Sequence, residues 1–138
     1  MRAPIALLAV LLPLALATGC GESAQAKAEK TVCEGKSEIS AGVNGLKGMT
    51  SATATVSAVQ SNLKSIESGL GKVTSAQDQL SSKRREEVEH ATAQLSAGLS
   101  SFAHELTSLT GAQAQAKLAA AGEKLVASYQ HALAPIPC

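Results

Sequence analysis

The chain has 138 residues, a formal net charge of +1, one Phe, one Tyr and no Trp. Its 12 Lys and Arg residues against 11 Asp and Glu form no concentrated excess of basic charge for phosphate, and two aromatic residues cannot build a base-stacking surface. The composition therefore argues against nucleic acid as a partner.

The first segment is an apolar run that ends at a cysteine. After Arg2, residues 3–16 carry no charge, and small residues then lead to Cys20. One positive charge, a short apolar core and a small-residue cleavage zone are typical of a secretory signal, and the run is shorter than the ~20 apolar residues of a membrane-spanning helix. We therefore expect residues 1–19 to be a signal peptide outside the fold.

Within this segment, Ala17-Thr18-Gly19-Cys20 resembles the lipobox of bacterial lipoproteins. The resemblance covers the first 20 residues and implies cleavage before Cys20, whose thiol then carries a diacylglyceryl group. It departs from the family at Ala17, where the family favours leucine, because Leu16 lies one residue too early. The resemblance implies a protein held by its lipid on the outer, extracytoplasmic face of the cell membrane.

The alternative is an ordinary cleavage site at Ala15-Leu16-Ala17, which would release a soluble protein that carries Cys20. The number of cysteines favours the lipid anchor. An exported chain with Cys20, Cys33 and Cys138 leaves one thiol unpaired, whereas acylation of Cys20 leaves a pair. Two or more acyl chains, at ~0.8 kcal/mol for each buried CH₂ group, hold a protein on a membrane stably.

Residues 20–32 are small and polar, which predicts a flexible, lipid-anchored tether. Fully extended at ~3.5 Å per residue, this tether would reach about 40 Å from the lipid surface. The helical domain is then expected over residues 33–138.

Apolar side chains from residue 33 onward recur with a helical period. They predict helices at about residues 35–46, 51–81, 83–110 and 112–133, with a turn near Gly48. Thr110 and Gln113 have the spacing of a capping box for the last helix, and Gly69, Gly71 and Gly98 are expected to allow close helix packing. The stripes consist of Ile39, Val43 and Leu46; Val56, Val59, Leu63, Ile66, Leu70, Val73 and Leu80; Val88, Ala91, Leu95, Leu99, Phe102, Leu106 and Leu109; and Leu118, Gly122, Leu125, Tyr129 and Leu133.

The boundary at Ser81-Ser82 contains no Gly or Pro, so a continuous helix is the alternative to a turn. A continuous stripe would place the guanidinium of Arg84 in the apolar seam, which favours the turn. The predicted fold is all-α, either an antiparallel up-and-down helical bundle or a long coiled-coil hairpin.

Cys33 precedes the first predicted helix and Cys138 is the last residue. An up-and-down bundle brings these two positions to one end only if the number of helices is even, and an odd number would leave them far beyond the ~7 Å Cα separation that a disulfide allows. Four helices and a Cys33–Cys138 disulfide are therefore predicted together. The alternative of free or metal-binding thiols lacks a matching cluster of His and Cys.

No residue pattern predicts catalysis, a metal or a cofactor, because no nucleophile, zinc or phosphate-binding motif is present. His90 and His104 lie ~21 Å apart along one predicted helix, and Glu86 with His90 would hold a metal only weakly. The charge run at residues 83–89 predicts an exposed face with Lys83–Glu87 and Arg85–Glu89 pairs. A docking patch is the alternative for this run.

The arrangement as a whole resembles small helical bacterial lipoproteins of unassigned function. It implies a membrane-anchored envelope lipoprotein with a structural or protein-interaction role toward an envelope protein. The alternatives are a carrier that binds a small apolar ligand within the bundle and a second chain that completes the apolar seam.

Overall fold

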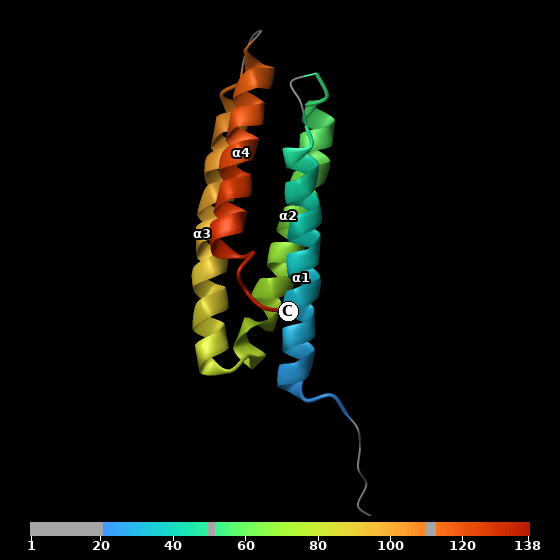
Figure 1. The fold of residues 1–138 in the computed structure, drawn as a ribbon, viewed down its shortest axis with the longest axis vertical. Helices are drawn as coiled ribbons and strands as arrows, with labels where there is room; N and C mark the ends of the chain where they lie inside the picture. Colours follow the sequence, from blue (N-terminus) through green and yellow to red (C-terminus); the bar gives the residue numbers. More distant parts are fainter. Residues whose placement is uncertain (1–20, 50–51, 110–112) are drawn as a thin grey trace, which may run out of the picture.

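The computed structural model describes residues 21–49, 52–109 and 113–138. Within these ranges the chain forms α1 (Ala24–Lys47), α2 (Val56–Ala76), the short 3₁₀ helix η1 (Gln77–Gln79), α3 (Ser82–Thr107) and α4 (Ala114–Ala132). Two antiparallel hairpins, α1 with α2 and α3 with α4, stand side by side (Figure 1). Both hairpin loops lie at one end, the loop end, and η1 joins α2 to α3 at the other, the turn end. The predicted all-α up-and-down bundle is confirmed.

The first helix begins well before the predicted residue 35. The Ser23 side chain accepts a hydrogen bond from the Ala26 backbone N–H at 3.1 Å and caps a helix that starts at Ala24. Ala28 and Val32 are 3% and 0% exposed and extend the apolar stripe of Ile39 toward the N-terminus. The prediction of a flexible tether is therefore wrong for residues 24–32. The small and polar composition of this segment is typical of a linker, but Ala28 lies in the core.

The boundaries of α3 and α4 lie within about three residues of the predicted ones, whereas α2 is about five residues shorter at each end than the predicted helix at 51–81. Gly48 caps the C-terminus of α1, as expected, and the Thr55 hydroxyl accepts a hydrogen bond from the Ala58 N–H at 3.1 Å to start α2. The predicted capping box cannot be placed, since Thr110 lies outside the described residues. Gln113 occupies the N-cap position of α4 without a side-chain capping bond.

The turn predicted at Ser81 is present and is stabilised by polar contacts. Arg85 donates to the backbone oxygens of Gln77 and Asp78 at 3.2 and 3.0 Å, and the Gln77 oxygen also accepts the backbone N–H of Leu80 at 3.1 Å. The amide of Gln77, which interrupts the apolar stripe, donates to the buried Thr92 hydroxyl at 3.0 Å. The polar position in the stripe therefore links η1, at the end of α2, to α3.

Glycines bring the backbones of α1 and α2 into contact. A Cβ atom at Gly35 would lie 2.6 Å from the Gly69 carbonyl oxygen, and one at Gly69 would overlap the Gly35 carbonyl oxygen. On α3, a Cβ at Gly98 would lie 2.9 Å from the Ser128 hydroxyl of α4. The predicted packing role is confirmed for Gly69 and Gly98, whereas Gly71 has open space around it and no such role.

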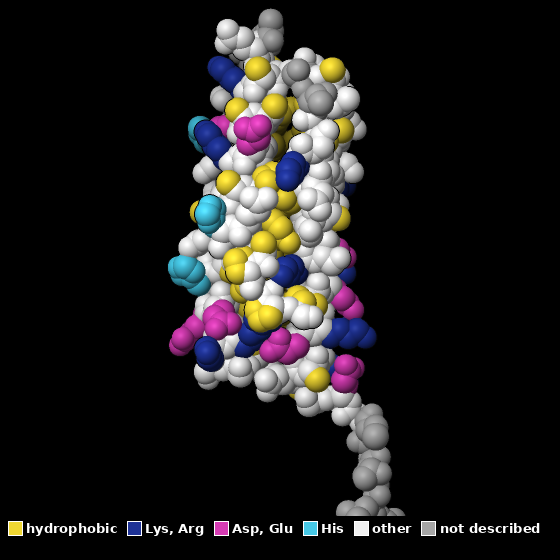
Figure 2. Space-filling view, viewed as in Figure 1, with side chains coloured by type: hydrophobic (Ala, Val, Ile, Leu, Met, Phe, Trp, Pro, Cys, Tyr) yellow, Lys and Arg dark blue, Asp and Glu magenta, His cyan; other side chains and the backbone are white. Residues whose placement is uncertain are grey.

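Most residues of the predicted stripes form the core, but burial decreases toward the loop end. Val56 is 64% exposed, and Leu63, Leu99 and Leu106 are only partly buried. The prediction of a core position is wrong for Val56, because it starts α2 beside an open groove and no helix covers it. Figure 2 shows hydrophobic side chains along the seam between the hairpins. The large side chains under 2% exposed are Val32, Ile39, Val59, Ile66, Val73, Val88, Leu95, Leu125 and Leu133.

The α1–α2 contact predicts opposite effects for two glycine substitutions on the same helix. Gly69→Ala should lower the free energy of unfolding by about 1–3 kcal/mol, because its Cβ would force the Gly35 backbone away. Gly71→Ala should raise it by roughly 0.5–1 kcal/mol, because Gly71 is exposed and alanine favours the helix. Urea unfolding of the oxidised proteins, followed by circular dichroism, measures both. A Gly69→Ala protein as stable as wild type would contradict the close approach.

Candidate functional site

The last helix does not extend as far as the turn end. The 19 residues of α4 span about 28 Å, against about 39 Å for the 26 residues of α3. The chain continues as residues 133–138, the C-terminal tail, which crosses toward α1 (Figure 1). Leu133 and Ile136 of this tail are 0% and 6% exposed. The tail therefore supplies core side chains where α4 is absent.

A disulfide between Cys33 and Cys138 joins the tail to α1. The Cα atoms of the two residues lie 5.6 Å apart, within the range that a disulfide requires. This confirms the predicted pairing, with one difference in placement. Cys33 lies within α1 rather than before the first helix, so the tail runs along the bundle to meet it.

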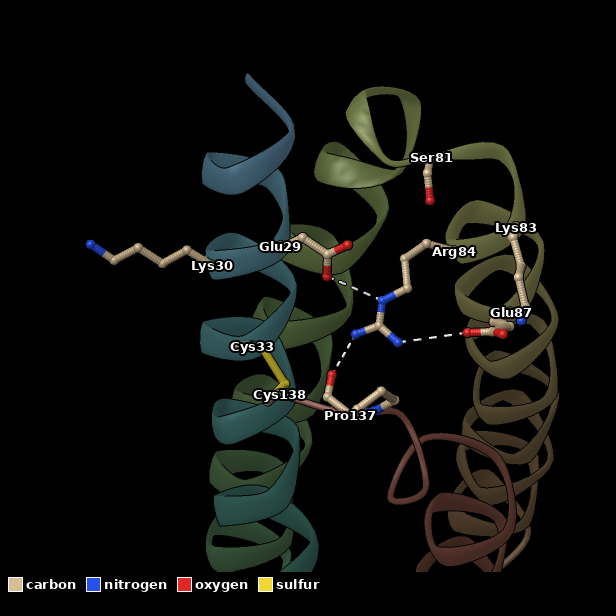
Figure 3. Close-up of a pocket in the computed structure, with 9 residues that line it drawn as sticks. All are labelled: Glu29, Lys30, Cys33, Ser81, Lys83, Arg84, Glu87, Pro137 and Cys138. Atoms are coloured by element: carbon tan, nitrogen blue, oxygen red, sulfur yellow. Dashed lines mark hydrogen bonds and ion pairs between the residues drawn. A yellow bond between two sulfur atoms is a disulfide. The ribbon is translucent and has the colours of Figure 1, made fainter. Parts of the chain in front are cut away.

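Arg84 binds the tail and α1 from the side of α3 (Figure 3). Its Nε donates to Glu29 Oε2 at 3.1 Å, a terminal nitrogen donates to the Pro137 carbonyl oxygen, and the other lies 3.7 Å from Glu87 Oε2. The side chain is only 11% exposed. The planar guanidinium therefore spans three segments with its several donors.

The charge run at residues 83–89 thus differs from the solvated face that the sequence predicted. Glu87 pairs with Arg84 rather than Lys83, and Arg85 binds backbone carbonyls rather than Glu89. Lys83, Glu87 and Glu89 remain exposed. The run is therefore exposed in part, while its two arginines stabilise the turn end.

Lys36 of α1 holds the tail from another direction. Its ammonium group donates to the backbone oxygens of Ala134 and Ile136 at 2.9 and 2.5 Å. Burial, and next the positive charge of Arg84, lower the pKa of the Lys36 amine. We call Cys33, Lys36 and Arg84, together with the tail that they hold, the clasp.

A cavity of about 560 Å³ lies beside the clasp and is lined mainly by charged and polar side chains, among them Glu29, Lys83 and Arg84. Lys30 points away from the cluster (Figure 3). The guanidinium of Arg84 already donates hydrogen bonds to the Glu29 carboxylate and the Pro137 carbonyl and forms an ion pair with Glu87. The arrangement is therefore suited to holding the tail rather than to binding a ligand.

The histidines and carboxylates considered as metal ligands do not form a cluster. His90, His104 and His131 are exposed, and the Gln94 amide lies 3.3–3.4 Å from the ring nitrogens of His90. Across the three described ranges, no three His, Cys, Asp or Glu side chains lie close enough to hold a metal ion. In the same ranges, every buried polar side-chain atom has a hydrogen-bond partner.

A second site, the loop-end groove, has a volume of about 640 Å³ and a mostly apolar lining. The sequence does not predict this groove, because the apolar residues of this end have the spacing of a closed core. The sequence feature that could have indicated a groove is the set of alanines at positions 54, 103 and 114, since small side chains leave space between helices. The groove is lined by Ala54, Thr55, Val56, Gln60, Leu63, Ala103, Leu106, Thr107, Leu109, Ala114, Gln115 and Leu118.

Comparisons with other proteins assign no family to the chain. No protein-family model, no curated protein and no solved structure matches it. The two sites are therefore interpreted from their own residues and geometry.

The contacts of Arg84 predict that this residue contributes more to the free energy of unfolding than an exposed ion pair does. Arg84→Leu should lower the free energy of unfolding by about 1–2 kcal/mol, because the Glu29 carboxylate and the Pro137 carbonyl lose their hydrogen-bond donor and Glu87 loses its ion-pair partner. Lys124→Leu is the control, since Lys124 pairs with Glu105 while 74% exposed and should change stability by less than about 0.5 kcal/mol. Equal effects of the two substitutions in urea unfolding would show that Arg84 does not hold the tail.

The disulfide should be the strongest element of the clasp. Its partners are 105 residues apart in sequence, so the double variant Cys33→Ser/Cys138→Ser should lose about 3–5 kcal/mol of unfolding free energy through the freed unfolded chain. Cys20→Ser is the control and should unfold like wild type. Chemical denaturation without reductant measures the difference, and a double variant as stable as wild type would rule out this contribution.

Proposed function

We propose that this chain is an extracytoplasmic lipoprotein, anchored to the outer face of a cell membrane through acylated Cys20, whose helical domain has a structural and protein-interaction role. The observation that best supports the proposal is the start of α1. Gly21, Glu22 and Ser23 alone separate Cys20 from the first helical residue, Ala24. A lipid on Cys20 would therefore be attached almost directly to a helix.

This short connection restricts the position of the domain. Three residues extend by roughly 10 Å, so the turn end would lie next to the lipid head groups instead of about 40 Å away. Since α1 is about 36 Å long, the loop end would lie on the far side of the domain from the membrane. In this proposal the clasp faces the membrane and the loop end faces outward.

Membrane binding is assigned here to the acyl chains of Cys20. None of the helices in the described part of the chain is both long and apolar enough to cross a membrane.

The interaction role is supported by the way in which the helical surface is held. The glycine contact fixes α2 against α1, and the clasp fixes the tail against both hairpins. A surface ordered before binding loses little conformational entropy when a partner docks. We therefore assign the outward-facing helices to an envelope protein partner rather than to a reaction.

Metabolic labelling tests the anchor and native mass spectrometry tests the role. Cells that express the full chain should incorporate a fatty-acid label into wild type and into the matched control Cys33→Ala/Cys138→Ala, but not into Cys20→Ala. The wild-type protein, extracted from its own membrane, should retain a stoichiometric polypeptide partner.

The two measurements test separate parts of the proposal. An unlabelled wild-type protein would disprove the anchor, whatever it binds. A labelled protein that is always a bare monomer would disprove the interaction role while leaving the anchor in place.

A further inference from the structure

The loop-end groove lies between the two hairpins, at the end of the bundle away from the clasp. It opens between the first turns of α2 and the last turns of α3 and reaches Leu118 of α4. No Cα atom of α2 approaches one of α4 within 8 Å, so side chains alone fill the space between these helices. The groove stays open because Ala54, Ala103 and Ala114, which line it, have small side chains.

The walls of the groove carry no charge. Val56, Leu106 and Leu109 are among its apolar residues, and none of the described residues that line it is Asp, Glu, Lys, Arg or His. The surrounding sequence has the same character, since residues 48–63 and 106–116 contain no ionisable side chain, although the chain has 23 Asp, Glu, Lys and Arg residues. A charged ligand would lose its hydration without gaining an ionic partner in the walls.

Two amides supply polar groups at the edge of this apolar space. Gln60 of α2 and Gln115 of α4 are exposed, and neither side chain has a hydrogen-bond partner within the described residues. The Thr55 hydroxyl differs from them, because it already accepts the N–H of Ala58. An uncharged head group could therefore bond to donors and acceptors on two helices.

The size of the groove favours a small molecule over a protein as its occupant. Twelve residues line about 640 Å³, which falls within the ~300–1,000 Å³ typical of small-molecule sites. A stable protein interface uses about 20 to 30 residues on each side. The groove by itself is too small for a second copy of the chain or for another protein domain.

We infer that the loop-end groove binds a small, uncharged, apolar molecule with one hydrogen-bonding head group, such as a medium-chain alcohol. The hydrocarbon part lies against Val56, Leu106 and Leu109, and the head group bonds to Gln60 or Gln115. This binding function goes beyond the proposed interaction role and does not depend on acylation of Cys20.

Photolabelling of the full chain in phosphatidylcholine nanodiscs tests the inference. The probe is decanol that carries an alkyl diazirine, and the labelled positions are read by peptide mass spectrometry. Label should concentrate in peptides that contain residues 54–63 and 103–118, and excess decanol should compete with it more effectively than decanoate.

Three variants make the test specific. Ala103→Trp fills the groove from an exposed position of α3 and should reduce labelling about tenfold, which corresponds to a tenfold weaker affinity. Val56→Lys adds a charge at a 64% exposed position and should act in the same direction without disturbing the core. Ala97→Trp, exposed on α3 but outside the groove, is the matched control and should label like wild type. Circular dichroism confirms that each variant is folded.

Several results would overturn the inference. They are label spread along all helices, label unchanged in both Ala103→Trp and Val56→Lys, and equal competition by decanoate. The unacylated Cys20→Ser chain, labelled in buffer without nanodiscs, should give the same labelling pattern, so the two proposals fail independently.

Discussion

The bundle depends on the attachment of its C-terminal tail to α1. Because α4 ends about 10 Å before the level that α3 reaches, the turn end has three helices and lacks a fourth. Leu133 and Ile136 fill part of that space with apolar side chains. An irregular segment exposes backbone carbonyls that a helix would satisfy, and Lys36 and Arg84 donate to them. The disulfide then makes this arrangement permanent under oxidising conditions.

Much of the fold follows from residue spacing, and the errors have a common cause. The period of Ile, Leu and Val located α2, α3, α4 and the end of α1, because these side chains are large enough for burial to decide their positions. The start of α1 was missed because its inner face includes Ala28 and Gly35, whose small side chains do not distinguish a buried helix face from a linker. Val56 fits the same period, but whether a neighbouring helix covers it is decided by tertiary packing.

The two candidate sites differ in how far the sequence predicts them. Counting thiols identified Cys33 and Cys138, because an exported chain with an acylated cysteine leaves one pair. The partners of Lys36 and Arg84 are mainly backbone carbonyls, which every residue has, so no sequence pattern indicates them. The groove exists because the small side chains of Ala103 and Ala114 do not fill the space between the helices. A sequence shows that a side chain is small, but only the packing of the helices shows whether a neighbour fills the space beside it.

The clasp joins the two hairpins at one end of the bundle and can therefore act as a pivot between them. Covalent and ionic links join the hairpins near the turn end, while the loop end has apolar contacts of partly exposed side chains. A rotation of about five degrees about that pivot would move the far tips of the hairpins by roughly 3 Å over ~36 Å of helix. A change in the width of the groove opening at that end would therefore break no covalent bond and no ion pair between the hairpins among the described residues.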